Sequence, residues 1–369
     1  MAEKVVVAMS GGVDSSVAAL LLKQQGYEVI GVTMQIWPQP EDKAKTCCSL
    51  EAVGDARKVS WKLDIPHYVM NFRDEFEEKV IKYFCREYIK GRTPNPCIAC
   101  NRYIKFESLL HKARGIGVDY IATGHYSRIV RDWENEEKYL LLTGVDPTKD
   151  QSYALYSMTQ EQLKHTLFPL GDRKKEEVRA IAREAGLPVF DKPESQEICF
   201  VSDDNYAGFV EEYLDIPPVE GEVKSVTGES LGKHKGVHNY TIGQRRGFGL
   251  ALGHPVYVTK IDPQEQVVWV GEDKDLFFDS LVASDFNYIS GVPFRDPVKV
   301  QAKIRYNSPK VEAVAYTKAD CVQVDFRQPQ RAVAPGQAVV LYDGEIVLGG
   351  GTIEYGNAWR SKIQSRSRF

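Results

Sequence analysis

The sequence lacks a strong net charge, a long apolar run and an amino-terminal leader pattern. Its 47 Lys and Arg residues against 51 Asp and Glu residues give a formal net charge of −4, so any nucleic-acid contact would come from local patches rather than a global positive field. No apolar run approaches the roughly 18–20 residues of a membrane-spanning helix, and the opening MAEKVVVAMS has no signal-peptide pattern. These absences predict a cytoplasmic protein that uses no membrane.

The chain also has too few cysteines for a disulfide framework. Seven cysteines in 369 residues are odd in number, which leaves room for catalytic, redox or metal-binding thiols. Cys85 and Cys321 are predicted to be small core residues. A hydrophobic fraction of 43% and a charged fraction of 27% are typical of globular proteins, and the length predicts two or three domains.

A glycine-rich segment near the amino terminus lacks the Lys of a kinase or GTPase phosphate loop. The apolar run Val5–Met9 leads into Ser10-Gly11-Gly12-Val13-Asp14-Ser15-Ser16, and a helix is predicted over 17–25. A strand, a glycine-rich turn and a helix direct unpaired backbone N–H groups and the positive end of the helix dipole at an anion. Because the Lys-Ser/Thr pair is absent, the loop is predicted to bind phosphates without transferring a γ-phosphoryl group.

Strand-like and helix-like runs alternate through the first 200 residues, which predicts a parallel sheet with helices on both faces. A capping box of Thr159 and Gln162 predicts a later helix. Ligands bind at the carboxyl ends of parallel strands, where the glycine-rich loop, Met34 and Thr123-Gly124-His125 would meet. Strands are predicted at 5–9, 28–34, 67–71 and 120–123, and helices at 50–63, 74–89 and 103–114.

The pattern changes at Ile216-Pro217-Pro218, beyond which short strands replace helices. Val298–Tyr306 alternates, with Lys303 and Arg305 on the face opposite Tyr306, and Asp343-Gly344 predicts a type I′ hairpin turn. The predicted fold class is α/β plus β: a parallel-sheet domain followed by two small, barrel-like β domains. The predicted domain limits are 1–215, 216–280 and 281–369.

Two cysteine segments indicate chemistry. The first, Thr93-Pro94-Asn95-Pro96-Cys97-Ile98-Ala99-Cys100-Asn101, predicts Cys100 at the start of a helix, where the dipole and free N–H groups favour the thiolate. Three interpretations stay open: a thioredoxin-like redox pair, half of a zinc site with Cys47-Cys48, or a single nucleophile with a distant partner. Cys199, in the polar segment 194–200, is the candidate partner.

Several segments, in colinear order from residue 5 to about 355, resemble the tRNA-specific 2-thiouridylase family. They are SGGVDSS, NPCIACN, ATGHY, KDQSY, ESQEICFV, TIGQRRGFG, IRY and APGQ. SGGVDSS alone indicates only the PP-loop ATP pyrophosphatases, whose domain is an adenine-nucleotide-hydrolase-like parallel sheet. The two cysteine segments with KDQSY and GQRRG make the resemblance specific.

The resemblance implies a tRNA-uridine 2-sulfurtransferase that acts on the wobble uridine (U34) of tRNAs for Lys, Glu and Gln. ATP, with Mg²⁺ as cofactor, would adenylate O2 of the uridine, and a persulfide on Cys199 would bring sulfur to C2. Cys100 would be the nucleophile that releases this sulfur and could be left disulfide-bonded to Cys199. A cysteine desulfurase or a sulfur-carrier protein would load Cys199, and the enzyme would be a monomer.

The resemblance also assigns binding residues. Many family members carry Asp at the position of Cys97, so an acid–base role there is either dispensable or filled by Cys97 or another group. Asp14 is placed to hold Mg²⁺ with the phosphates. The residues implied for ATP are Ala8, Met9, Ser10, Gly11, Gly12, Val13, Asp14, Ser15, Met34 and Gly124. Those implied for the target base are Asn95, Pro96 and Cys97. Those implied for tRNA are His125, Lys149, Asp150, Gln151, Arg305, Tyr306 and Gln337, some of them in a helical insertion of the first domain.

Other interpretations remain for the tail and for the whole chain. The basic tail would either contact phosphates or be a solvated terminus. The chain could instead be another adenylating PP-loop enzyme, such as an amide-forming ligase, in which the cysteines would be incidental. It could also be a tRNA-binding module without catalysis, which pyrophosphate release stimulated by tRNA would exclude. The tail cations are Arg360, Lys362, Arg366 and Arg368.

Overall fold

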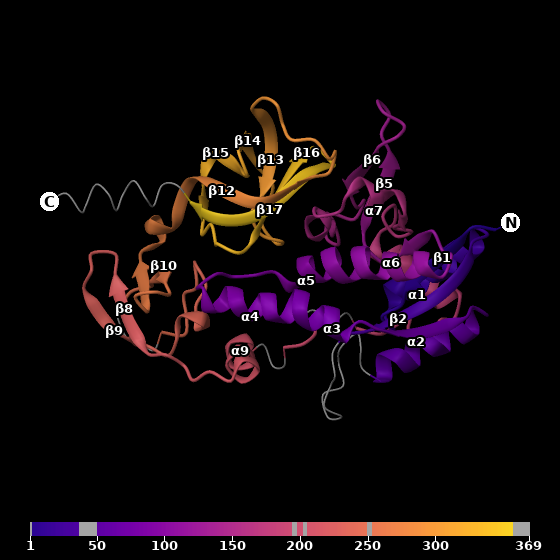
Figure 1. Cartoon of the computed structure of the whole chain (residues 1–369), viewed down its shortest axis with the longest axis horizontal. Coiled ribbons are helices and arrows are strands. Elements are labelled where there is room, and N and C mark those ends of the chain that lie inside the picture. Colours follow the sequence, from indigo (N-terminus) through magenta and orange to yellow (C-terminus); the bar gives the residue numbers. More distant parts are fainter. Residues whose placement is uncertain (1, 37–49, 194–197, 202–204, 249–252, 357–369) are drawn as a thin grey trace.

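The parallel sheet predicted for the first domain is present in the computed structural model (Figure 1), which describes residues 2–36, 50–193, 198–201, 205–248 and 253–356. Its strand order is β3-β2-β1-β4-β7. The strands are β1 (Lys4–Ala8), β2 (Glu28–Gln35), β3 (His67–Asn71), β4 (Tyr120–Ala122) and β7 (Thr166–Leu167). The four predicted strands are therefore confirmed to within a residue at either end, and β7 is an addition.

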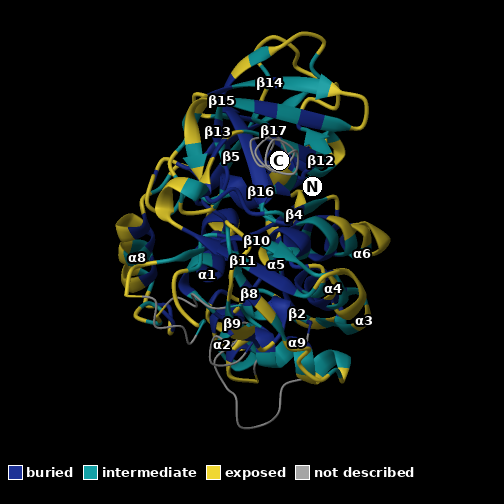
Figure 2. Ribbon diagram, turned by 90° about the vertical axis from the view of Figure 1, so that its left-hand side faces the viewer, coloured by how far each residue is buried: buried dark blue, intermediate teal, exposed yellow. Residues whose placement is uncertain are grey.

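Strand β1 is buried on both faces, which is why its sequence is a continuous apolar run. Val5 and Val7 pack into one core with α1 (Val13–Gln24), α2 (Leu50–Lys62) and α8 (Lys175–Glu184). Val6 and Ala8 pack into a second core on the opposite face. The buried residues, dark blue in Figure 2, run through the strands of this sheet and of the barrel beyond it. The prediction of helices on both faces is confirmed.

Two helical runs cover the second face and extend from the sheet towards the β domains (Figure 1). Two of their segments, η1 and η2, are π-helical, a rare conformation with i→i+5 hydrogen bonds that recurs at functional sites. The first run is α3 (Arg73–Phe76), η1 (Glu77–Ile81) and α4 (Lys82–Ile89), and the second is α5 (Pro96–Ala99), η2 (Cys100–Ser108) and α6 (Leu109–Gly115). The helix predicted at 103–114 therefore begins earlier, at Pro96.

A hairpin links the first domain to the barrel. Its strands, β5 (Ser127–Arg131) and β6 (Tyr139–Thr143), follow β4 in the chain but pair with each other and not with the parallel sheet. Leu142 of β6 pairs with Ile346 of the barrel. The predicted capping box of Thr159 and Gln162 is confirmed at the start of α7. The remaining helices of this region are η3 (Ser152–Leu155), α7 (Gln160–Lys164) and α9 (Tyr206–Leu214).

The carboxyl-terminal part consists of two β structures, so the predicted fold class is confirmed, while the domain limits stay predictions. One is a sheet in the order β10-β11-β8-β9, and the other is an antiparallel barrel closed by pairing of β12 with β17. The first contains β8 (Gly221–Ser225), β9 (Ser230–His234), η4 (Val237–Asn239), β10 (Tyr257–Asp262) and β11 (Val267–Gly271). The second follows η5 (Asp273–Leu276) and contains β12 (Phe277–Tyr288), β13 (Val298–Lys303), β14 (Val311–Lys318), β15 (Cys321–Arg331), β16 (Ala338–Asp343) and β17 (Ile346–Gly356).

The hairpin between β16 and β17 turns one residue later than predicted. Asp343 pairs with Ile346, so the two-residue loop is Gly344-Glu345. Of these two residues only Gly344, with φ +57°, has a positive φ, whereas a type I′ turn needs positive φ at both positions. The prediction of a type I′ turn is therefore wrong, because Asp343 stays in the strand ladder.

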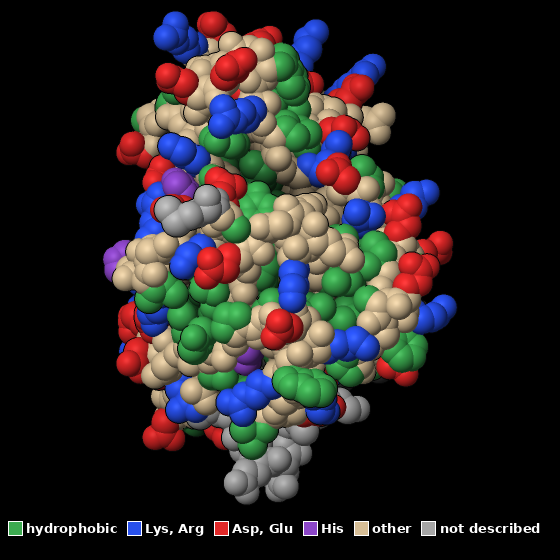
Figure 3. All heavy atoms as spheres, turned by 90° about the vertical axis from the view of Figure 1, so that its right-hand side faces the viewer, with side chains coloured by type: hydrophobic (Ala, Val, Ile, Leu, Met, Phe, Trp, Pro, Cys, Tyr) green, Lys and Arg blue, Asp and Glu red, His purple; other side chains and the backbone are tan. Residues whose placement is uncertain are grey.

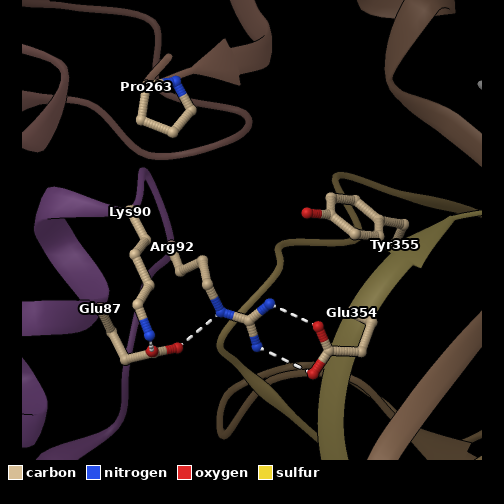
Figure 4. Close-up of a pocket in the computed structure, with 6 residues that line it drawn as sticks. All are labelled: Glu87, Lys90, Arg92, Pro263, Glu354 and Tyr355. Carbon is tan, nitrogen blue, oxygen red and sulfur yellow. Dashed lines mark hydrogen bonds and ion pairs between the residues drawn. The ribbon is translucent and has the colours of Figure 1, made fainter.

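Arg92, between α4 and α5, clamps the first domain to the barrel (Figure 4). Its Nε donates to Glu87 Oε2 at 2.5 Å, and its terminal nitrogens donate to the two carboxylate oxygens of Glu354 on β17 at 2.6 and 3.1 Å. These side chains line a cavity of about 400 Å³ with Lys90, Pro263 and Tyr355. Lys90 also pairs with Glu87. The charged side chains that line this cavity are thus paired with one another, and these ion pairs join the first domain to the barrel.

Arg92→Met should lower the free energy of unfolding by about 3 kcal/mol, because it leaves the half-buried Glu354 without an ion-pair partner and the buried Glu87 with only its pair to Lys90. Lys82→Ala on α4 is the matched control. It removes the solvent-exposed pair with Glu78 and should leave the unfolding midpoint almost unchanged. Urea unfolding of both variants measures the difference, and equal losses would contradict the clamp.

Candidate functional site

The glycine-rich loop lies between β1 and α1, at the carboxyl edge of the parallel sheet. Gly11 has φ +70°, and a Cβ there would lie 2.3 Å from the Ala52 carbonyl oxygen of α2. Only glycine fits this close, left-handed turn. Gly12 is the N-cap of α1 and provides no side-chain cap, so the first backbone N–H groups of the helix are available to an anion.

The serine hydroxyls of the loop are tied back to its own backbone. Ser15 Oγ accepts from the Ser10 N–H at 3.2 Å and donates to the Gly12 carbonyl at 3.2 Å. Ser16 Oγ donates to the same carbonyl at 2.7 Å. These bonds fix the shape of the loop, so its N–H groups are oriented before a ligand arrives.

Lys175, the first residue of α8, reaches the loop from a distant part of the chain. Its Nζ donates to the two carboxylate oxygens of Asp14 at 2.7 and 2.8 Å, and Tyr126 Oη donates to Asp14 Oδ1 at 2.7 Å. Only 8% of Lys175 is exposed. Sequence reasoning missed this residue, because a Lys at the start of a charged helix gives no local signal that it faces a loop 161 residues away.

Asp14 as a Mg²⁺ ligand stays a prediction. Within the described ranges no three His, Cys, Asp or Glu side chains group to hold a metal. Mg²⁺ is commonly bound by one or two carboxylates together with substrate phosphates. A single carboxylate in a phosphate-type loop fits that mode of binding, although here the carboxylate is shared with Lys175.

Gly124, two residues after the end of β4, lies against the loop. A Cβ at Gly124 would lie 2.8 Å from the Asp14 carbonyl carbon and the Ser15 nitrogen, so glycine lets the two carboxyl-edge segments touch. Met34, near the end of the neighbouring strand β2, is half-buried at the same edge. The structure therefore places Gly124 against the loop and Met34 at the same edge of the sheet, while their roles as ATP-binding residues stay predictions.

His125 connects this edge to the helix that carries the thiols. Its ring packs between Phe106 of η2 and Phe168, with centroid distances of 5.8 and 5.7 Å, and its Nδ1 lies 2.6 Å from Thr123 Oγ1. Burial, and then the charge of Lys105, lower the pKa of His125 well below 6.5. The resemblance assigns His125 to tRNA, but the structure leaves it only 8% exposed, as a neutral ring between the two parts of the site.

The C-x-x-C pair lies at the start of the second helical run, with Cys97 in α5 and Cys100 as the first residue of η2. Asn95 is the N-cap of α5, with Oδ1 accepting from the Cys97 and Ile98 N–H groups at 3.1 and 3.3 Å, and Pro96 is its first residue. Cys97 is exposed in the first turn, whereas Cys100 is half-buried at the start of η2. The prediction that Cys100 begins the helix is wrong. The Asn95-Pro96 pair was the local signal for the true start.

Cys199 lies in the short described segment 198–201 and is half-buried. It packs against the same apolar core as Cys100. The neighbouring Phe200 anchors the segment through an edge-to-face contact with Phe76, with ring centroids 5.7 Å apart. The structure thus brings to one core two cysteines that are far apart in sequence, while a disulfide between them stays a prediction.

The other cysteine predictions have mixed outcomes. Cys85 is buried as predicted, and burial raises the pKa of its thiol to about 12. Cys321 is half-buried at the start of β15, with its Sγ 3.2 Å from the Lys318 carbonyl, so its prediction as a core residue is wrong. Residues 194–197 of the Cys199 segment, Cys47-Cys48 and the basic tail lie outside the described residues.

The segment 91–95, which leads into α5, is held by both β domains. The Thr93 N–H donates to the Pro335 carbonyl at 2.8 Å, and Gln337 Nε2 donates to the Thr93 carbonyl at 2.8 Å. Thr93 Oγ1 donates to Thr241 Oγ1 at 3.2 Å. The resemblance assigns Gln337 to tRNA. In this structure Gln337 positions the segment before the thiol helix, the run α5–η2 that carries Cys97 and Cys100.

Arg305 and Tyr306 lie in different environments. Arg305 Nη2 donates to the carbonyls of Ile242 and Ala332 at 3.1 and 2.6 Å and so joins the central sheet to the barrel. Burial lowers the pKa of Arg305. Tyr306 lies beyond the end of β13, is 40% exposed, and donates to the Asp150 carbonyl at 3.3 Å. Of the two, Tyr306 is the one presented to solvent.

The Lys149-Asp150-Gln151 segment is half-buried and structured by its own side chains. The Asp150 carboxylate accepts from the Gly144 and Ser152 N–H groups at 3.1 Å each. Gln151 Oε1 accepts from the Tyr126 N–H at 3.0 Å. The segment is therefore bonded to two tyrosines: Tyr126, which contacts Asp14 of the glycine-rich loop, and the exposed Tyr306.

Two lysines beside Tyr306 were not predicted as site residues. Lys303 Nζ lies 5.5 Å from the Tyr306 ring centroid, and Lys310 Nζ lies 4.0 Å from that of Tyr342. Burial lowers the pKa of each lysine. Cations held against aromatic rings next to an exposed tyrosine suit contacts with a nucleic-acid backbone and a stacked base. The strand alternation marked Lys303 but gave no sign of Lys310, which follows the turn.

The family models that match the chain divide it into three parts. Residues 3–203 match the tRNA methyl transferase HUP domain, residues 207–272 the tRNA methyl transferase PRC-barrel domain, and residues 278–353 the aminomethyltransferase beta-barrel domain. The class of protein is thus a HUP domain followed by two β domains.

Proteins named tRNA-specific 2-thiouridylase MnmA match nearly the whole chain. The one from Acetivibrio thermocellus is 55% identical over 357 residues, covering 95% of this chain and 99% of the relative. The one from Clostridioides difficile is 52% identical over 358 residues, covering 96% and 99%. The chain belongs to the tRNA-specific 2-thiouridylase family, which confirms the resemblance seen in its motifs. In the described part of the chain, no helix has the length and apolar character needed to cross a membrane.

Acid pH should destabilise the protein through His125. Its pKa is lower in the folded chain than in the unfolded one, so its contribution is present above pH 6.5 and is lost as pH falls below that value. The loss approaches about 1.4 kcal/mol per pH unit for one such group. Urea unfolding between pH 7.5 and 5 should show a shallower decline for His125→Gln than for the wild type. Identical slopes would show that His125 does not remain neutral in the folded protein.

Proposed function

We propose that this chain catalyses the ATP-dependent 2-thiolation of the wobble uridine (U34) of tRNA, giving 2-thiouridine, AMP and pyrophosphate. One juxtaposition carries the proposal: the phosphate-type loop and the thiol helix meet at one sheet edge, through Gly124 and His125. Relatives more than 50% identical along nearly the whole chain are named for this activity. The family resemblance adds the tRNAs for Lys, Glu and Gln as substrates, a cytoplasmic location and a monomeric state.

In the first step, the loop binds the phosphates of ATP. Uridine O2 attacks the α-phosphorus and pyrophosphate leaves, so that O2 becomes part of an AMP leaving group. The N–H groups at the start of α1 bind the phosphate oxygens, and Lys175 orients Asp14 beside them. Mg²⁺, when bound by Asp14 and the phosphates, neutralises phosphate charge. The residues proposed to line the nucleotide are Ala8, Met9, Ser10, Gly11, Gly12, Val13, Ser15, Met34 and Gly124.

In the second step, sulfur replaces the activated oxygen. The terminal sulfur of a Cys199 persulfide attacks C2, and AMP leaves with the former O2. The Cys100 thiolate then bonds to Cys199 Sγ, the S–S bond to the transferred sulfur breaks, and C2 keeps the sulfur as a thione. Alternatively, Cys100 attacks first and releases hydrosulfide, which attacks C2. Both orders leave a Cys100–Cys199 disulfide, which an external thiol reductant must reopen before a cysteine desulfurase or sulfur carrier reloads Cys199.

The tRNA is proposed to lie across the opening of the site. Asn95, Pro96 and Cys97 at the start of α5 surround the target base. Acidic and basic side chains are interspersed on the face shown in Figure 3, which agrees with binding through local patches. One such patch consists of Lys149, Asp150, Gln151, Lys303, Tyr306 and Lys310, while His125, Arg305 and Gln337 support it from within.

An amide-forming ligase is the alternative enzyme, and a tRNA-binding module without catalysis is the alternative of another class. The ligase would have no use for Cys100 and Cys199, which both border the same apolar core. The inactive module would have no use for an uncapped helix start with a paired carboxylate and ammonium beside it. Both observations favour thiolation.

Cys199→Ser should still adenylate the tRNA but transfer no sulfur, because it keeps the loop and loses the persulfide. Asp14→Ala should lose both steps. The measurements are tRNA-dependent pyrophosphate release and mass analysis of the nucleosides. Cys321→Ser, at the half-buried edge of the barrel, is the control and should retain both steps. Formation of 2-thiouridine by Cys199→Ser would refute the persulfide assignment.

Lys175→Met should weaken ATP binding at least about tenfold, since it removes a charge-assisted pair that holds Asp14 at the loop. Lys174→Met is the matched control, because its exposed side chain precedes the same helix. Calorimetric titration with ATP in the absence of tRNA separates binding from chemistry. Equal affinities for the two variants would remove Lys175 from the nucleotide site.

A further inference from the structure

Lys105 lies one π-helical turn beyond Cys100. In an α-helix, with 3.6 residues per turn, five residues correspond to about 140° beyond a full turn, which would place Lys105 well away from Cys100. The wider winding of η2, with its i→i+5 hydrogen bonds, instead makes Lys105 a neighbour of Cys100 on the next turn, as residues i and i+4 are in an α-helix. Cys97, three residues before Cys100 in the preceding α-helical turn, lies on the same side. The π-helix therefore places a cation on the side of the helix that carries the thiols.

The side chain of Lys105 is bound by the buried amide of Asn101, the residue after Cys100. Its Nζ donates to Asn101 Oδ1 at 2.9 Å. Asn101, the residue after Cys100, is only 3% exposed, and its Nδ2 donates to the Ala154 carbonyl at 2.9 Å. A neutral amide orients the ammonium of Lys105 without cancelling its charge. Among the described residues, no carboxylate forms an ion pair with Lys105.

The charged groups described near Lys105 do not form an ion pair with it. Arg102, on the same helix, is ion-paired with Asp285 of β12, so these two charges cancel. His125 is neutral because burial lowers its pKa. The packed helices α3 and η1 also carry carboxylates, of which Glu75 pairs with Lys112, Glu78 pairs with Lys82 and Glu77 accepts from Tyr213. The other charged or titratable groups on the described elements around this turn include Arg73, Asp74, Lys79, Cys97, Tyr103, Glu107, Cys199, and Tyr153 and Tyr156, whose pKa values burial raises.

We propose that Lys105 stabilises the thiolate of Cys100 and so keeps this nucleophile reactive at neutral pH. A nearby ammonium lowers the cost of ionising a thiol. The proton passes to solvent, and the thiolate then forms the bond to Cys199 Sγ while the persulfide S–S bond breaks. The inference rests on the proposed function only in taking Cys100 as the nucleophile of sulfur transfer.

The test is the pH dependence of Cys100 alkylation by iodoacetamide, resolved by peptide mass analysis on the full chain without ATP or tRNA. In Lys105→Met the midpoint of the profile should move up by about one pH unit. At neutral pH the rate should fall about threefold, since a tenfold loss of thiolate is partly offset by the greater nucleophilicity of a more basic thiol. Lys105→Arg should keep the wild-type midpoint, as should Lys112→Met, farther along the same run.

An unchanged midpoint in Lys105→Met would overturn the proposal, and so would a shift of equal size in Lys105→Arg or in Lys112→Met. If Lys105→Met does not fold, Lys105→Gln provides the same comparison with a polar side chain. Alkylation requires neither ATP nor tRNA. A wild-type protein that fails to thiolate tRNA would therefore refute the proposed function. The effect of Lys105 on Cys100 would still be tested by the pH profile of alkylation.

Discussion

The short segment 91–95 has to bind two β domains at once, and the geometry of the thiol helix depends on it. Arg92 joins Glu87 to Glu354 of the barrel. The backbone of Thr93 exchanges hydrogen bonds with Pro335 and Gln337, and its hydroxyl bonds to Thr241 of the central domain. Asn95 then caps α5. The barrel and the central sheet contribute neither proposed thiol, but they fix where the helix that carries Cys97 and Cys100 begins.

The charges at the sheet edge are arranged for anions. The loop presents the start of α1, and Lys175 pairs with Asp14, the one carboxylate within the loop. His125 stays neutral and contributes a packed ring. Lys105, on the thiol helix, has only an amide partner among the described residues. Such a site suits a nucleotide phosphate on one side and a thiolate on the other.

Much of the fold follows from local patterns in the sequence. A strand buried on both faces has to be apolar throughout, so the run Val5–Met9 marks the centre of the parallel sheet. The glycines of the loop are required by the close approach of α2, and Asn95-Pro96 is a recognisable helix start. These features depend on neighbours in sequence or on burial alone, which explains why they can be predicted.

Features that depend on distant partners could not be predicted. The position of Lys175 depends on how α8 packs against α1. Arg305 faces inward because two carbonyls from other segments accept its hydrogen bonds, whereas strand alternation placed it only on the face opposite Tyr306. The π-helical turns are set by tertiary packing rather than by a residue type, so the position of Lys105 on the turn after Cys100 did not follow from the predicted helix.

The most direct test of the account is nucleoside mass analysis of a tRNA with uridine at position 34, incubated with the protein, ATP, Mg²⁺ and a cysteine desulfurase supplied with cysteine. The account predicts that 2-thiouridine appears at position 34, that its formation requires ATP, and that AMP and pyrophosphate form in proportion to it. The account would be contradicted if the uridine stayed unmodified while the protein, in the presence of tRNA, used ATP to form a different adenylated product.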